Sequence, residues 1–314
     1  MNLCKAIFIP IVLSGTAIGC GGSANPPATP AGTNATESTD APAAATPAAG
    51  ATDEGKPAAA SSGAADVATG LRSLERRSAS LDFDLNLSKH GAGSGVQHGQ
   101  WSFSEERTLR VKKAKDNKIL ELEVVYGKWE AKPLLGLTYE VPTNDKTYQL
   151  AFVDKLTIAH GSDKVSPAEE QAVSAEYGWV GNASPLRQAL LDSKMVPDMH
   201  LTGSPQISAA LLGAIPGVDI AHAGLMATFK SVKAQPRKTA MLEVAGSFSI
   251  KSKKTTFDIE MKGPAEVDVA TGWVQSMDLQ GTASIAGQTD VPKKGAMDVE
   301  GKGKVTIGRH SEFR

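Results

Sequence analysis

The amino-acid sequence predicts an α+β protein, in which a disordered linker precedes a curved antiparallel β-meander with a few short helices inserted in its middle. Three observations support this prediction. Residues 21–65 contain no large apolar side chain, and apolar and polar residues alternate with a period of two on both sides of the chain's middle. Three Ser-Pro pairs, each typical of a helix start, lie between residues 166 and 205. The meander is expected to be either one half-barrel-like sheet or two sheets.

The first twenty residues have the pattern of an export signal. Lys5 precedes an apolar run at residues 6–13 that is too short to span a bilayer. The following Ala17-Ile18-Gly19-Cys20 resembles the lipobox of bacterial lipoproteins. This resemblance implies that Cys20 is the first residue of the mature chain, that it bears acyl groups such as palmitate, and that they anchor the protein in the cell envelope, at the outer membrane or the periplasmic face. An ordinary cleaved signal peptide and an uncleaved anchor are the alternatives.

The composition divides the chain into a signal peptide (residues 1–19), a tether rich in Ala, Pro and Thr (residues 20–65) and a β-rich domain (residues 66–314). Between residues 21 and 65 there is no Leu, Ile, Val, Phe, Tyr, Trp or Met, so the tether has nothing to bury that would offset the entropy of ordering. Both cysteines lie in the first twenty residues, which excludes disulfides and cysteine metal ligands from the domain. Acidic and basic residues nearly cancel in the domain, which argues against nucleic-acid binding.

The first part of the domain, residues 66–160, is predicted to be mostly strands. Residues 66–75 carry Val67, Leu71 and Leu74 at helical spacing and predict a short helix. Alternation of apolar and polar residues then predicts five strands, at residues 81–87, 100–111, 120–126, 137–141 and 147–152. The connections are polar or rich in glycine, so we expect an antiparallel meander with one face in water.

The middle of the domain, residues 166–214, is predicted to be a helical insert. Ser166-Pro167 is followed by Glu169, which is the pattern of a capping box with proline at the first helical position. Ser184-Pro185 and Ser204-Pro205 repeat the start before apolar residues at helical spacing. We therefore expect three short helices between about residues 167 and 214.

Strand patterns return in the last part of the domain, residues 215–314. Apolar residues recur at every second position in five segments, at residues 242–250, 257–261, 267–269, 273–285 and 297–307. Gly281, Gly301 and Gly303 lie within these patterns and permit bending or bulging. The order of strands, helices and strands favours a strongly curved sheet packed on short helices.

Two segments of the domain resemble those of a known family. The expected helix at residues 71–74 runs into the strand at residues 81–87, and the turn Asp268-Val269-Ala270-Thr271-Gly272 joins two late strands before Trp273. This layout resembles the half-barrel lipoprotein-localisation (Lol-type) carriers of the bacterial envelope, and the turn is similar to one in many envelope lipoproteins. The resemblance covers at most residues 66–90 and 255–290. It implies a concave apolar face that holds acyl chains, and it carries over no functional residue.

We find no sequence motif that predicts a catalytic residue, a cofactor site or a metal site. The six histidines form no His-Glu-x-x-His pattern, and the nearest metal-like spacings, Asp198 with His200 and Asp219 with His222, are more simply loop residues. No Gly-x-Ser-x-Gly elbow or phosphate-binding glycine loop occurs. Residues 160–163 (His-Gly-Ser-Asp) contain the residue types of a catalytic triad, but their adjacency is typical of a turn.

The tryptophans are the candidate ligand-contacting residues. Trp101, Trp129 and Trp273 lie in or beside predicted strands, where they line an apolar concavity or belong to an ordinary core. Together with the anchor and the tether, this predicts a lipid-anchored, non-enzymatic envelope protein that binds an apolar ligand or lipid in its curved sheet. The alternatives are an interaction module that binds another envelope protein and, third, a hydrolase.

Overall fold

The computed structural model describes residues 66–89, 92–132, 141–201, 205–213, 224–234, 236–252, 254–291 and 295–314. The chain divides into two units, residues 1–54 and 55–314, and all described residues belong to the second. The predicted signal peptide, the lipidation site Cys20 and the predicted tether lie outside the described residues. Within the described residues, no helix has the length and apolarity that a membrane span requires.

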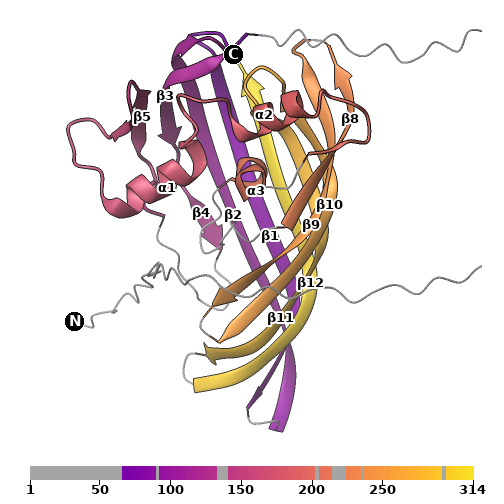
Figure 1. The fold of residues 1–314 in the computed structure, drawn as a ribbon. Coiled ribbons are helices and arrows are strands. Elements are labelled where there is room, and N and C mark those ends of the chain that lie inside the picture. The colour runs from indigo at the N-terminus through magenta and orange to yellow at the C-terminus, as the bar shows by residue number, and fades with distance from the viewer. Residues whose placement is uncertain are drawn as a thin grey trace, which may run out of the picture. The chain divides into compact units, whose positions relative to one another are not determined.

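The described residues form twelve strands and three helices (Figure 1). The strands are β1 (Arg72–Lys89), β2 (Ala92–Lys115), β3 (Lys118–Tyr126), β4 (Glu130–Lys132), β5 (Thr147–Phe152), β6 (Leu156–Ala159), β7 (His200–Leu201), β8 (Gly224–Lys233), β9 (Thr239–Ser252), β10 (Thr255–Asp268), β11 (Val274–Val291) and β12 (Gly295–Phe313). The helices are α1 (Pro167–Tyr177), α2 (Pro185–Asp192) and α3 (Pro205–Leu212).

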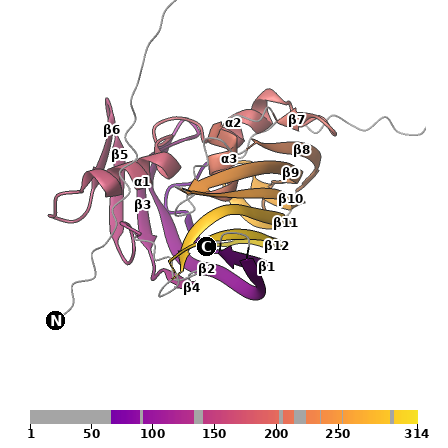
Figure 2. The same cartoon turned by 90° about the horizontal axis from the view of Figure 1, so that it is seen from below.

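The described strands form one antiparallel sheet in which two meanders meet at β1 and β12. The strand order is β6-β5-β3-β2-β1-β12-β11-β10-β9-β8-β7, and β4 pairs with β2. Since β6 and β7 lie at opposite edges, the chain must cross one face of the sheet between them, and α1 and α2 lie on this crossing. Figure 2 shows the sheet curving around the helices. The predicted α+β class with a curved antiparallel sheet is thus confirmed, in its one-sheet form.

The sheet separates an apolar concave face from a polar convex face. Along β1, residues at odd positions from Ser73 to Leu87 are buried, whereas Asp82, Asp84 and Asn86 between them are exposed. The same period of two continues in β12, where Val299, Val305 and Ile307 are buried. A strand that buries only one face needs this alternation, because successive side chains point to opposite sides of the sheet.

Glycines on the concave face make room for large side chains of the neighbouring strands. Gly303 of β12 lies opposite Phe83 of β1, and a Cβ atom at this glycine would lie 2.8 Å from Cδ1 of Phe83. Gly301, two residues earlier, lies opposite Leu85 in the same way. A Cβ atom at Gly301 would lie 2.9 Å from Cδ2 of Leu85. The sheet curves so strongly here that the rings of Phe83 and Phe257 meet at 6.1 Å, although β12 and β11 lie between their strands.

The three predicted helices are confirmed. The side chain of Ser166 accepts a hydrogen bond from the Glu169 amide, and the Glu169 carboxylate accepts one from the Ser166 amide at 2.8 Å, which completes the capping box. A hydrogen bond from Lys146 lowers the pKa of Glu169, so this cap remains ionised. Ser184 caps α2 in the same way through the Arg187 amide.

The predicted helix at residues 66–75 is wrong, because β1 already begins at Arg72. Glu75 and Arg77 take the buried positions of this strand, where an amphipathic strand would have apolar residues. The sequence therefore shows no alternation of apolar and polar residues at the start of β1. Val67, Leu71 and Leu74 have a helical spacing only by coincidence. Most of the expected strand at residues 137–141 lies outside the described residues.

Candidate functional site

The concave face carries two apolar clusters. The larger one includes α2, α3 and the long strands, and eleven of its members on β1, β2, β9, β10, β11 and β12 are called here the long-strand cluster. Its members are Phe83, Leu85, Leu87, Trp101, Phe103, Phe248, Ile259, Met261, Ile285, Met297 and Val299. The second, the α1 cluster, joins α1 to β2, β3 and β5 through Leu109, Val111, Leu122, Val124, Tyr126, Tyr148, Val173 and Tyr177.

A band of buried charge lies between the two clusters. It consists of six residues, which are Glu75 and Arg77 of β1, Glu105 and Arg107 of β2, Arg309 of β12 and Glu176 of α1. Arg77 Nη1 lies 2.9 Å from Glu176 Oε1, and Arg107 Nη1 pairs with the other oxygen of the same carboxylate. Arg107 also binds Glu105 at 2.7 Å, and its guanidinium lies 4.4 Å from the ring centre of Tyr126. This charged band, with three arginines and three glutamates, is neutral overall.

The charged band also ties α3 to the sheet. Arg309 Nη1 donates to the carbonyl oxygens of Ala210 (2.6 Å) and Leu211 (3.0 Å), and Arg77 Nη2 donates to that of Leu212 (3.0 Å). These carbonyls lie at the C-terminal end of α3, which the helix dipole makes negative. Gly213 follows with a positive φ of 66°, which ends the helix without steric strain. Arg309 Nε and Glu75 Oε1 lie 2.9 Å apart as an ion pair but lack hydrogen-bond geometry.

The charged band positions α1 and α3 on the sheet. Removing charges from water costs several kcal/mol per ion, which mutual attraction only roughly repays. Burial by itself disfavours the ionised form of Glu176, but the charges of Arg107 and Arg77 outweigh it and hold the pKa of Glu176 at about 2. Sequence reasoning missed this band. Its signal is that Glu75, Arg77 and Arg309 occupy buried positions of strands that also bury apolar residues, such as Ala79 to Leu87 at the odd positions of β1 and Val305 and Ile307 of β12.

Two of the three candidate tryptophans come together at the long-strand cluster, because Trp101 is a member of it and Trp129 packs against it. Phe103 lies between them: the ring centre of Trp129 stacks 4.4 Å away from it, and that of Trp101 lies 5.4 Å away at a steep angle. Trp129 remains partly exposed, as does Phe257 on the facing limb of the sheet. Trp273 lies elsewhere, in the α1 cluster, where it stacks on Phe313 at 6.2 Å.

The turn at residues 268–272 has a structural role. Asp268 Oδ1 accepts hydrogen bonds from the backbone and hydroxyl of Thr271, and Arg237 donates to Oδ2 at 2.7 Å. Ser184, the cap of α2, donates to the Thr271 carbonyl at 2.6 Å. Gly272 has a positive φ of 72°, and a Cβ atom there would lie 2.7 Å from the Arg187 amide of α2. The turn therefore holds the N-terminus of α2 against the sheet.

The other candidate polar residues do not assemble into a site. His160 and Asp163 pair across a turn, as their adjacency predicted, and His160 Nδ1 lies 2.7 Å from the Thr147 carbonyl. Asp198 pairs with Lys230, whereas His200 contacts Thr228; Asp219 and His222 lie outside the described residues. In the described part of the chain, no group of three His, Cys, Asp or Glu side chains is placed to hold a metal ion.

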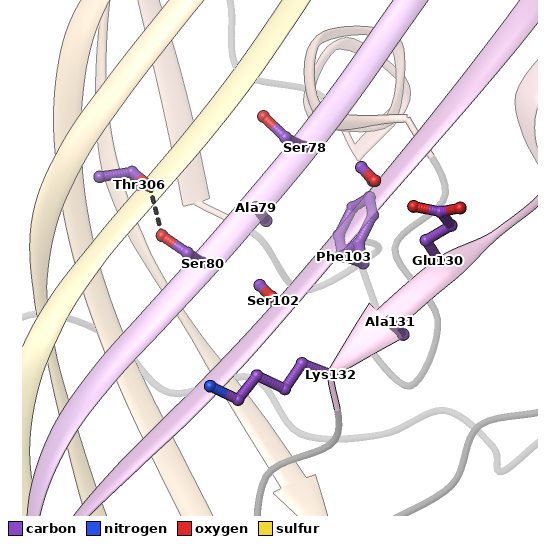
Figure 3. Close-up of a pocket in the computed structure, with 10 residues that line it drawn as sticks. Ser78, Ala79, Ser80, Ser102, Phe103, Glu130, Ala131, Lys132 and Thr306 are labelled. Carbon is purple, nitrogen blue, oxygen red and sulfur yellow. Dashed lines mark hydrogen bonds between the residues drawn. The ribbon is translucent and has the colours of Figure 1, made fainter.

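A shallow hollow of about 450 Å³ lies where β4 joins β2 (Figure 3). Its lining includes the hydroxyl groups of Ser78, Ser80, Ser102, Ser104 and Thr306, with Glu130 and Lys132 on β4. Ser80 and Thr306 hydrogen-bond to each other at 2.7 Å. The serines and Thr306 belong to the polar convex face, whereas Ala79 and Phe103, which also line the hollow, are buried members of the larger apolar cluster.

Comparisons with known proteins give little further guidance. No family model matches the chain, and no curated protein matches it. Among solved structures, it is similar to a chain described as "lipid-protein interactions in lipovitellin", with 8% identity and a TM-score of 0.29. That match covers 79% of this chain but only 26% of the lipovitellin chain. At this TM-score the similarity supports no conclusion about the ligand of the present protein.

Proposed function

We propose that this protein is a lipid-anchored, non-enzymatic binding protein of the cell envelope that holds an apolar ligand on the concave face of its sheet. The observation that carries the proposal is the extent of the apolar face. Three short helices cover its upper part, and the long strands continue below them with an apolar concave side (Figure 1). The side chains of this lower part are at most 9% exposed because they pack against one another across the curve, so a ligand would enter by separating them.

The long-strand cluster suits an acyl chain in shape and chemistry. Its side chains are all apolar, and the charged band bounds it on β1 and β2, next to Ala79 and Phe103. Trp129 and Phe257, the two partly exposed rings, stand on facing limbs of the curve and mark the route of access. A bound chain would replace contacts such as that between Phe83 and Phe257, and each buried CH₂ group would contribute about 0.8 kcal/mol.

A filling substitution tests this site. Ala283 of β11 faces the concave side between Ile259 and Gly303, so Ala283→Leu places extra carbon atoms where the ligand would lie. Because the larger side chain occupies this space, we expect the substitution to weaken binding of the fluorescent probe 1-aminoanthracene at least tenfold. The fold should remain intact, since overpacking of a core costs about 1–3 kcal/mol. The control is Thr282→Leu, one residue away on the exposed convex face.

This test is made on the full chain carrying Cys20→Ser, so that no detergent competes with the probe. Far-ultraviolet circular dichroism reports whether both variants keep the fold. Uptake of the probe by neither the parent chain nor the Thr282→Leu control, with the fold intact, would overturn the proposed ligand site.

The membrane anchor is tested separately through its cysteine. Cys20→Ser removes the only thiol that the lipobox resemblance assigns to lipidation, and we expect the protein to move from the membrane to the soluble fraction. Cys4→Ser is the matched control, since Cys4 would be removed with the signal peptide and its loss should leave the protein on the membrane. Fractionation followed by immunoblotting measures both. Membrane association that survives Cys20→Ser contradicts the anchor.

A further inference from the structure

Two buried hydrogen-bond donors, one in the long-strand cluster and one packed against it, have no partner. The indole nitrogens of Trp101 and Trp129 are shielded from solvent, and neither donates to any acceptor. Trp101 is only 8% exposed. The two indoles flank the same ring, Phe103, so both donors belong to one part of the concave face.

Unpaired buried donors are uncommon in native proteins, because each buried N–H group without an acceptor costs about 1–3 kcal/mol of stability. Indole nitrogen can only donate, so the missing group must be an acceptor. Every other member of the long-strand cluster is an apolar side chain and offers none. An acceptor carried by the bound ligand would satisfy both donors.

The surroundings favour a neutral acceptor over an anion. Glu105 lies two residues from Phe103 on the same face of β2, and its Oε1 is buried without a hydrogen bond. The three arginines of the charged band are already engaged by glutamates or by the carbonyls of α3. A second carboxylate placed here would be buried without a counter-ion, which is far more costly than burying an ester.

We propose that Trp101 and Trp129 bind the carbonyl oxygen of an ester-linked acyl chain, and that the protein thereby selects acylated esters over free fatty-acid anions. This inference rests on the proposed function, because it names the polar end of the same apolar ligand. The acyl chain lies along the long-strand cluster, and its ester group lies beside Phe103.

Three ligands with the same chain length test this selection on the full chain carrying Cys20→Ser. Methyl dodecanoate, dodecane and sodium dodecanoate each compete with bound 1-aminoanthracene, and their inhibition constants are compared. We expect the ester to bind more tightly than the alkane or the anion. In Trp101→Phe and Trp129→Phe, the preference of the protein for ester over alkane should fall about fivefold each, which is the loss of about one neutral hydrogen bond.

The comparison with dodecane distinguishes loss of the N–H donor from loss of ring area. A smaller ring weakens the binding of dodecane and of the ester equally, whereas loss of the donor weakens only the binding of the ester. Trp179→Phe is the control, since Trp179 packs on the α1 cluster and its indole already donates to the Glu176 carbonyl at 3.0 Å. Trp129 is partly exposed, so its variant is informative even where Trp101→Phe disturbs folding.

The possible failures are distinguishable. If the probe and the alkane bind but the preference for the ester is unchanged in both tryptophan variants, the inference is overturned and the apolar site stands. A preference for dodecanoate over the ester overturns it as well. If neither probe nor alkane binds the folded parent chain, the proposed function fails and this inference fails with it.

Discussion

Replacing Glu176 with alanine is expected to lower the free energy of unfolding by about 3–5 kcal/mol. This carboxylate binds Arg77 through one oxygen and Arg107 through the other, and all three side chains are at most 5% exposed. The substitution leaves two guanidinium groups buried beside Glu75 and Glu105 without the partner that reaches them from α1. Urea denaturation monitored by circular dichroism measures the loss. Glu170→Ala, at an exposed position of the same helix, should stay within about 0.5 kcal/mol of the wild type.

The pH dependence distinguishes a lost ion pair from simple loss of packing. The pKa of Glu176 is about 2 in the folded protein, below its ordinary value of 4.5. A lowered carboxyl pKa gives stability that is fully present above the unfolded value and is lost as the pH falls through the folded one. The wild type should therefore lose this contribution between about pH 4.5 and 2. Glu176→Gln should lack that part of the pH profile, and an unchanged profile would contradict the role given to the charged band.

Several parts of the fold follow from local sequence signals. The Ser-Pro pairs at residues 166 and 184 locate α1 and α2, because a serine cap and a proline in the first turn act within one turn of helix. The alternation in β10, β11 and β12 likewise locates those strands, since one of their faces is buried and the other is solvated. Glycines noted as sites of bending, such as Gly301 and Gly303, lie where large side chains of β1 need room.

The start of β1 could not be predicted, because its inward residues are charged. Glu75 and Arg77 are compatible with the core only when Arg309, 232 or more residues later in the chain, and Glu176 supply counter-charges and α3 supplies carbonyl acceptors. No local pattern encodes such long-range partners. The convergence of Trp101 and Trp129 on Phe103 has the same origin, since it depends on β4 pairing with β2. The placement of Trp273 in a different cluster likewise depends on the sheet as a whole.

Phe83→Ala is expected to destabilise the protein by about 3–5 kcal/mol. Phe83 has no exposed surface, and its ring fills the space above Gly303 on the adjacent strand and contacts Phe257 from across the curve. Glycine at position 303 has no side chain that could move into the vacated volume, so the cavity should collapse only partly. Urea denaturation measures the change against Asn86→Ala, an exposed position on the convex face of the same strand. A loss below about 1 kcal/mol would mean that the concave face closes around the missing ring, and that the curvature of the sheet does not depend on it.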